Sequence, residues 1–269
     1  MHLGLHLPQL DLDGTGLSHG RLTRAAAAAR GAGFGTVSAN DHVVFPRPWL
    51  DGLVALGAVV EATGELGLMT TVAVPALRHP AVLARTLVGL DLVSGGRVVA
   101  GIGAGSSRAD YEAVGIPFDE RWRRLDEAAV SLRQLLGDIP LWLASWGSPA
   151  GLRRVARHGD GWLASAYNTD PATFAAARTA LPDGLPAAVV TMWTWVTEDD
   201  AEAERVLAEL LAPAIGRDPD QLRSRVCVGS AQRCRELVAA YAEAGCERMH
   251  FWPVSDEERQ VELIAGLTP

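Results

Sequence analysis

The stretch ARGAGFGTVSA, residues 29–39, contains the unit that decides the fold. An alanine-rich helical pattern ends at glycines, and a short β-prone run follows. Glycine suits the left-handed position after a helix. The unit predicts a helix that leads directly into a strand.

The same unit recurs as EATGELGLMTTVAV (61–74), LVSGGRVVAGIG (92–103), ARHGDGWLASA (156–166) and YAEAGCERMHFW (241–252). Runs this apolar indicate strands buried on both faces, and their alternation with helices indicates a parallel sheet covered by helices. We expect strands near 2–8, 36–41, 66–74, 98–103, 140–145, 161–166, 187–196 and 248–253.

Eight such strands predict an α/β fold of the (β/α)8 TIM-barrel type, formed by residues 1–269 as a single domain. The alternative is an open, doubly wound sheet. Its dinucleotide fingerprint would normally follow the first strand, but the glycine-rich turn GIGAG (101–105) follows the fourth. The barrel is therefore the preferred fold.

Composition excludes several classes of function. The net charge of −8 argues against a nucleic-acid partner, and the absence of Lys removes Schiff-base chemistry. The spacing of Cys227, Cys234 and Cys246 fits no zinc motif, so we expect reduced thiols and no metal. No apolar run reaches the length of a membrane span and no leader pattern precedes the first strand, which predicts a cytoplasmic protein.

Active sites of such barrels form at the carboxyl ends of the strands. At the end of the second strand, Asp41 and His42 are adjacent, so one side chain points into the barrel while the other braces a loop. His42 is either a proton donor or acceptor or a locally satisfied histidine. Position alone leaves both readings open.

Two Gly-Ser segments precede predicted helices. In SWGSPAG, Ser148 and Pro149 suit a helix start, and Gly147 would admit a phosphate. GAGSSRAD offers a similar anion cradle with Ser106, although plain helix caps explain both segments. The helix predicted at 117–137 should bury Trp122, and one Trp of MWTWV (192–196) should face outward.

Four segments in order resemble the bacterial luciferase-like superfamily: DHVVFP, LRHPAVLARTLVGLDLVSGGR, GIGAGSSRADYEAVGIPFDERWRRLDE and GSPAGLRRVARHGDGWLAS. The resemblance covers about residues 2–253. It implies a barrel that binds reduced FMN or the deazaflavin coenzyme F420, and a homodimer. The chain is shorter than most members, so the insertion over the barrel mouth should be reduced.

The resemblance also implies roles for particular residues. His42 and Asp41 would be catalytic, and Thr71–Val72 would be a non-proline cis peptide against the coenzyme ring. The other coenzyme contacts would be Ala104, Gly105, Ser106, Ser145, Trp146, Gly147 and Ser148. From their places on the mouth loops, we expect Phe45, Trp49 and Trp252 to line a substrate pocket.

The favoured function is an F420-dependent oxidoreductase that moves a hydride to or from a small organic substrate. Ser106 stands where sugar-phosphate dehydrogenases of this branch use Glu, which argues against that substrate class. The alternative is a monooxygenase supplied with reduced FMN by a partner reductase. A third possibility is a non-catalytic barrel that binds a small ligand.

Overall fold

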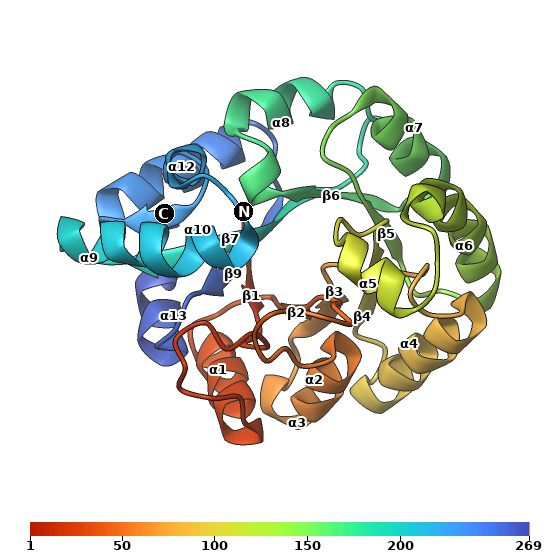
Figure 1. Ribbon diagram of the computed structural model, residues 1–269, viewed down its shortest axis with the longest axis horizontal. Helices are drawn as coiled ribbons and strands as arrows, with labels where there is room; N and C mark the ends of the chain where they lie inside the picture. The colour runs from red at the N-terminus through yellow and green to blue at the C-terminus, as the bar shows by residue number, and fades with distance from the viewer. Residues whose placement is uncertain (269) are drawn as a thin grey trace.

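The computed structural model describes residues 1–268 and shows a ring of parallel strands surrounded by helices (Figure 1). The strands are β1 (His2–His6), β2 (Thr36–Ala39), β3 (Gly67–Thr70), β4 (Val98–Ile102), β5 (Leu141–Ala144), β6 (Gly161–Ser165), β7 (Ala187–Val196), β8 (Cys227–Gly229) and β9 (Arg248–Pro253).

The helices alternate with these strands along the chain. They are α1 (His19–Gly31), α2 (Gly52–Ala58), α3 (Val60–Thr63), α4 (Pro80–Ser94), α5 (Arg108–Ala113), η1 (Phe118–Glu120), α6 (Arg121–Leu135), α7 (Pro149–His158), η2 (Ala166–Asn168), α8 (Pro171–Arg178), α9 (Asp200–Arg205), η3 (Val206–Leu211), α10 (Ala212–Ile215), α11 (Pro219–Arg223), α12 (Ala231–Glu243) and α13 (Glu257–Ala265).

The sheet closes on itself. Strands β1 to β6 pair in sequence order, β6 also pairs with β7, and β9 lies between β7 and β1. All of these pairings are parallel, so every barrel strand ends on the same side of the molecule. The predicted (β/α)8 barrel is confirmed, and its eight strands are the predicted ones.

The short strand β8 was not predicted. It pairs with the end of β7 at Thr194–Val196, outside the closed ring. Together with η3 and α10 it covers the outer side of β7, so Trp193 and Trp195 are both buried. The expectation that one of these Trp residues faces outward is wrong, because the 199–229 segment shields it.

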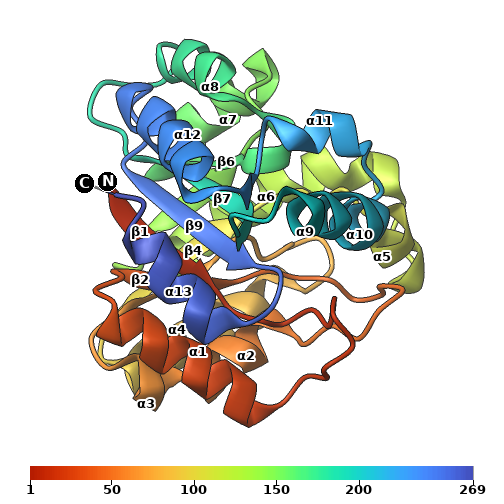
Figure 2. The same cartoon turned by 90° about the vertical axis from the view of Figure 1, so that its left-hand side faces the viewer.

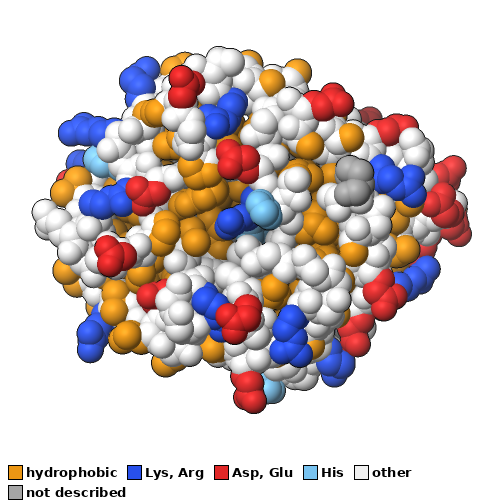
Figure 3. Space-filling model, turned by 180° about the vertical axis from the view of Figure 1, so that it is seen from behind, with side chains coloured by type: hydrophobic (Ala, Val, Ile, Leu, Met, Phe, Trp, Pro, Cys, Tyr) orange, Lys and Arg blue, Asp and Glu red, His pale blue; other side chains and the backbone are white. Residues whose placement is uncertain are grey.

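The apolar core has two main layers. The larger lies between the strands and the surrounding helices, and includes Leu5, Val37 and Leu141. A smaller one lies inside the ring and includes Met69, Trp142 and Leu163. Figure 2 shows α5, α9 and α10 on the side where the strands end. Figure 3 shows the opposite face, where hydrophobic side chains surround a central His and a basic side chain and charges of both signs lie further out.

Cys227, Cys234 and Cys246 are free and buried, as expected. Within residues 1–268, no helix combines the length and the apolar character that crossing a bilayer requires.

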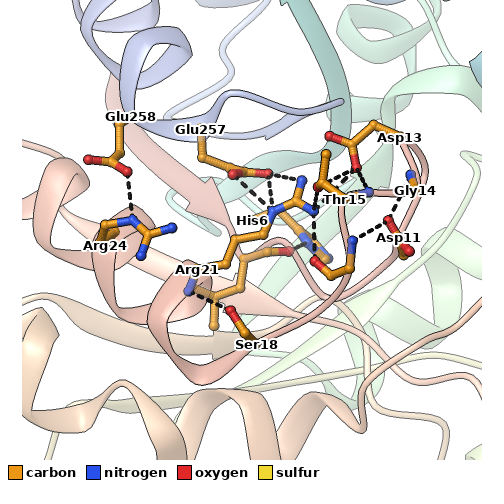
Figure 4. Close-up of polar contacts among 12 residues, drawn as sticks. His6, Asp11, Asp13, Gly14, Thr15, Ser18, Arg21, Arg24, Glu257 and Glu258 are labelled. Carbon is orange, nitrogen blue, oxygen red and sulfur yellow. Dashed lines mark hydrogen bonds and ion pairs between the residues drawn. The ribbon is translucent and has the colours of Figure 1, made fainter.

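A buried ion pair joins the two ends of the chain. Arg21 of α1 donates from Nη2 to Glu257 Oε1 of α13 at 2.6 Å, and its Nη1 donates to Asp13 and Thr15 in the loop before α1 (Figure 4). The Arg21 and Glu257 side chains are only 10% and 9% exposed. One turn along α1, Arg24 binds Glu258 in the same way, but those side chains are 61% and 59% exposed.

We expect Glu257→Ala to lower the free energy of unfolding by about 3–5 kcal/mol, because it leaves the Arg21 guanidinium buried without its carboxylate. The matched change Glu258→Ala should cost at most about 1 kcal/mol, since that pair is solvated. Urea unfolding monitored by circular dichroism measures both. Equal effects of the two substitutions would contradict this assignment.

Candidate active site

A cavity of about 310 Å³ opens at the carboxyl ends of the strands. Its lining combines apolar side chains with a few polar groups, as expected of a small-molecule site. The predicted residues that line it are Asp41, His42, Thr71, Val72, Ala104, Gly105, Ser106, Ser145, Trp146 and Ser148. The lining residues that were not assigned from the sequence are Asn40, Val74, Gly103, Asp110, Phe118, Arg121, Trp122, Ala144, Leu163, Ser165, Tyr167, Val190 and Thr191.

His42 is held by a carboxylate from another part of the chain. Its Nδ1 lies 2.7 Å from Oδ2 of Asp110, which is buried near the start of α5. The second oxygen, Oδ1, accepts hydrogen bonds from the backbone N–H groups of Val43 and Val44 at 2.9 and 2.8 Å. Asp110 therefore fixes both the ring of His42 and the loop that follows it.

The protonation of Asp110 determines what His42 can do. Burial acts to raise the pKa of Asp110, but the hydrogen bonds from His42 and from Val44 and Val43 outweigh it, so the pKa lies below its ordinary value. The carboxylate is therefore ionised at neutral pH and accepts the Nδ1–H of His42. The Nε2 atom is left to accept or donate a proton.

Asp41 is not hydrogen-bonded to His42, and of the two residues it is the one that braces a loop. Its carboxylate accepts hydrogen bonds from Arg78 at 2.9 and 3.2 Å and from the backbone N–H of Val74 at 3.1 Å. Arg78 also binds Asp51. Asp41 therefore holds the loop after β3, and both Asp41 and His42 line the cavity.

The Thr71–Val72 peptide bond is cis, as expected. It lies in the cavity wall next to Gly103, where a Cβ atom would come within 2.8 Å of Val72 Cγ2 and 3.2 Å of Ala144 Cβ. A side chain at position 103 would clash with Val72 and Ala144, so glycine allows these two residues to pack closely in the cavity wall. Two polar atoms of this wall, Asn40 Oδ1 and Thr71 Oγ1, are buried without a hydrogen-bond partner in the described chain.

The serine segments form caps at the cavity edge. Ser148 accepts a hydrogen bond from the N–H of Gly151 and begins α7, while Ser107 accepts from the N–H of Asp110 and begins α5. Ser106, Ser145 and Ser148 line the cavity, but Gly147 lines a separate surface depression between α7 and α8. Ser148 therefore caps α7, as the capping interpretation predicts. It also lines the cavity together with Ser145.

The aromatic residues expected in a substrate pocket lie elsewhere. Phe45, Trp49 and Trp252 are absent from the described lining of the cavity and pack in an apolar cluster with Trp193. Trp252 stacks between His6 and Trp193, with ring centroids 3.5 and 4.0 Å away. The rings of Trp49 and His42 lie edge-on with their centroids 4.4 Å apart, so this cluster packs against the histidine.

Two other Trp side chains lie at the cavity. Trp122, predicted to be buried by its helix, is 43% exposed, and Trp146 is 53% exposed. Trp122 lies in the first turn of α6, where the helix reaches beyond the barrel to the cavity mouth. The burial prediction is wrong because helical periodicity does not show where a helix extends past its support.

Residues 4–223 match the family described as luciferase-like monooxygenase. The chain belongs to this family. The membership predicted from the four sequence segments is confirmed.

Two of the curated relatives are named as F420-dependent dehydrogenases. An F420-dependent hydroxymycolic acid dehydrogenase of Mycobacterium tuberculosis is 32% identical over 194 residues, which cover 60% of this chain and 53% of the relative. The chain spans about half the length of the curated relatives it matches.

Two solved structures share the fold over almost the whole chain. An F420-dependent secondary alcohol dehydrogenase in complex with an F420-acetone adduct has a TM-score of 0.82 and 20% identity, covering 99% of this chain and 97% of the other. The oxygenating constituent of 3,6-diketocamphane monooxygenase from Pseudomonas putida, in complex with FMN, has a TM-score of 0.72 and 17% identity, covering 98% and 96%.

We expect Asp110→Asn to destabilise the fold by about 1–3 kcal/mol at pH 7, because the ionised carboxylate accepts three hydrogen bonds. Because the folded-state pKa of Asp110 is lowered, this stabilisation is complete at pH values above the ordinary Asp pKa of about 3.9. It is lost as the pH falls through the lower folded-state pKa. The difference between wild type and variant should therefore shrink below about pH 4. Urea unfolding across pH 3–7 measures it, with Asp183→Asn, an exposed loop position, as the control.

Proposed function

We propose that this protein is an oxidoreductase that uses the deazaflavin coenzyme F420 to move a hydride to or from a small organic substrate. The observation that carries the proposal is the Asp110–His42 pair facing the same cavity as the Thr71–Val72 peptide. The similarity to an F420-dependent dehydrogenase supports the choice of coenzyme.

The cavity wall fits the ring of such a coenzyme. Asn40 Oδ1 and Thr71 Oγ1 are buried polar atoms that would pair with donor and acceptor groups on a ring edge. Gly103 lets Val72 and Ala144 pack closely beside this wall. Ser106, Ser145 and Ser148, which lie at the cavity edge next to the starts of α5 and α7, would hold an anionic tail. When bound, the coenzyme supplies the hydride chemistry.

The chain's own contribution is proton transfer and positioning. His42 would exchange a proton with the substrate through Nε2, while Asp110 keeps the ring in place and stabilises the imidazolium form. Asp41 would act indirectly, because its carboxylate binds Arg78 and the backbone N–H of Val74. Val72, Val74, Leu163 and Val190 line the same space with apolar surface and would exclude water.

We expect fluorescence titration to show saturable binding of coenzyme F420 and much weaker binding of FMN, since the proposal commits to the deazaflavin. Tight binding of FMN with no response to F420 would replace the proposal with a flavin monooxygenase. Absence of binding by both would leave a barrel that binds another ligand.

We expect His42→Ala to retain coenzyme binding and to slow turnover by about 10²–10⁴, the usual contribution of a general acid or base. The assay follows coenzyme absorbance with whichever alcohol, ketone or enone wild type turns over. His19→Ala, an exposed position at the start of α1, is the control and should leave the rate unchanged. A His42→Ala rate equal to wild type would remove His42 from proton transfer.

A further inference from the structure

Arg121 places a cation in the wall of the cavity. It is the first residue of α6 and lines the cavity together with Phe118 and Trp122. The Cζ atom of its guanidinium lies 3.9 Å from the Phe118 ring centroid and 5.3 Å from the Trp122 ring centroid. A guanidinium stacks favourably on aromatic rings, so these two side chains hold it in the cavity wall.

Most of the hydrogen-bonding capacity of Arg121 is unused. Within residues 1–268 its side chain donates one hydrogen bond, from Nη1 to the backbone oxygen of Phe118 at 3.1 Å. The one carboxylate of this range within 4.0 Å is that of the exposed Asp119, whose Oδ1 lies 3.9 Å from Nη1, beyond hydrogen-bond reach. The N–H groups at Nε and Nη2 can therefore donate to a ligand.

Other arginines near the cavity are paired with carboxylates. Arg78 binds Asp41, and Arg124, which lies one turn along α6 from Arg121, binds Glu120. A partly buried guanidinium loses hydration, and a paired carboxylate compensates for that loss. Because Arg121 makes no hydrogen bond of this kind, a bound anion would gain more from it than from the two paired arginines.

Arg121 lies along the same wall of the cavity as the His42 pair. Asp110, the partner of His42, is followed by Tyr111, whose ring packs edge-on against Phe118 with the centroids 5.3 Å apart. Phe118 in turn carries the guanidinium of Arg121. The segment from α5 through η1 to the start of α6 therefore holds both groups, and a ligand bound at Arg121 can present its other end to His42.

The charges of the lining would orient an anionic ligand. Asp41 and Asp110 make the wall around His42 acidic, and their carboxylates already accept hydrogen bonds from the chain. An anionic group would be repelled there and attracted to Arg121. The uncharged end of the same molecule would be left for His42. A single guanidinium matches the single charge of a carboxylate and can bind both of its oxygens.

We propose that Arg121 binds the carboxylate of the substrate, which makes small hydroxy acids or keto acids the substrate class. The proposal rests on the function proposed above, because it names the substrate class of that site. Arg121 then determines which molecules bind, and His42 exchanges the proton of their hydroxyl or carbonyl group. The serines at the cavity edge are left for the coenzyme tail.

The test compares levulinate, a small keto acid, with its methyl ester, which has a similar shape and no charge. Saturation-transfer NMR titrations, with and without coenzyme F420, give the Kd of each. Wild type should bind levulinate about tenfold more tightly than the ester. Arg121→Gln should weaken levulinate binding by about 10- to 100-fold, the value of a hydrogen bond to a charged group, and leave the ester unchanged.

Two further variants separate this role from net charge and from folding. Arg124→Gln removes the same charge from the same helix outside the described cavity lining, so it should leave the Kd of levulinate unchanged. Arg121→Lys keeps the charge but not the planar pair of donors, so it should restore part of the affinity. An unchanged Kd for the methyl ester shows that the cavity of each variant is intact.

Equal affinities of wild type for levulinate and its ester, or equal levulinate affinities of wild type and Arg121→Gln, would overturn the proposal. It would also be overturned if Arg121→Gln lost affinity for F420 but not for the deazaflavin ring system without its phosphate tail, because Arg121 would then hold the coenzyme. Failure of wild type to bind F420 would contradict the proposed function, and the titrations without coenzyme would still decide the role of Arg121.

Discussion

The parallel pairing of β1 with β9 is the interaction on which the rest of the structure depends. Residues His2 to Leu5 pair in register with Arg248 to Phe251, and this joins the first strand to the last. Closure places the ends of β2, β4, β6 and β7 around a single cavity, although they are separated by long stretches of sequence. Because the ring is closed, Ser165 at the end of β6 lines the same cavity as His42, which follows β2.

Inside the ring, polarity is divided between two sides. His250 hydrogen-bonds Ser38 at 2.8 Å near β1 and β2, while Met69, Trp142 and Leu163 form the apolar opposite side. Burial lowers the pKa of His6 to about 3, and the pKa of His250 is lowered as well, so both rings are neutral. The two histidines are therefore uncharged, and the charge inside the ring belongs to Arg248, whose guanidinium lies 5.5 Å from the Trp142 ring centroid.

The strand pattern was predictable because five of the units repeat a helix, glycines and an apolar run in that order. Strand position and cap patterns also located His42 and the serine caps, whereas the Thr71–Val72 cis peptide was implied by the family resemblance. What the sequence could not supply was pairing across units: Asp110 as the partner of His42, and Arg78 as the partner of Asp41. The available signal for Asp110 was its position in the segment GAGSSRAD, which follows the fourth strand. The positive φ of Thr191 and the register shift between β7 and β9 at Val189–Met192 have no signature in the sequence of β7.

The bond between His42 and Asp110 joins two different repeats of the barrel. The histidine belongs to the second βα unit and its carboxylate to the fourth. Barrels of this kind are often treated as modular, with units that can be exchanged or duplicated separately. In this chain a recombination boundary between the second and fourth units would replace one partner without the other. Functional exchange of segments is therefore constrained to blocks that keep residues 42 and 110 together.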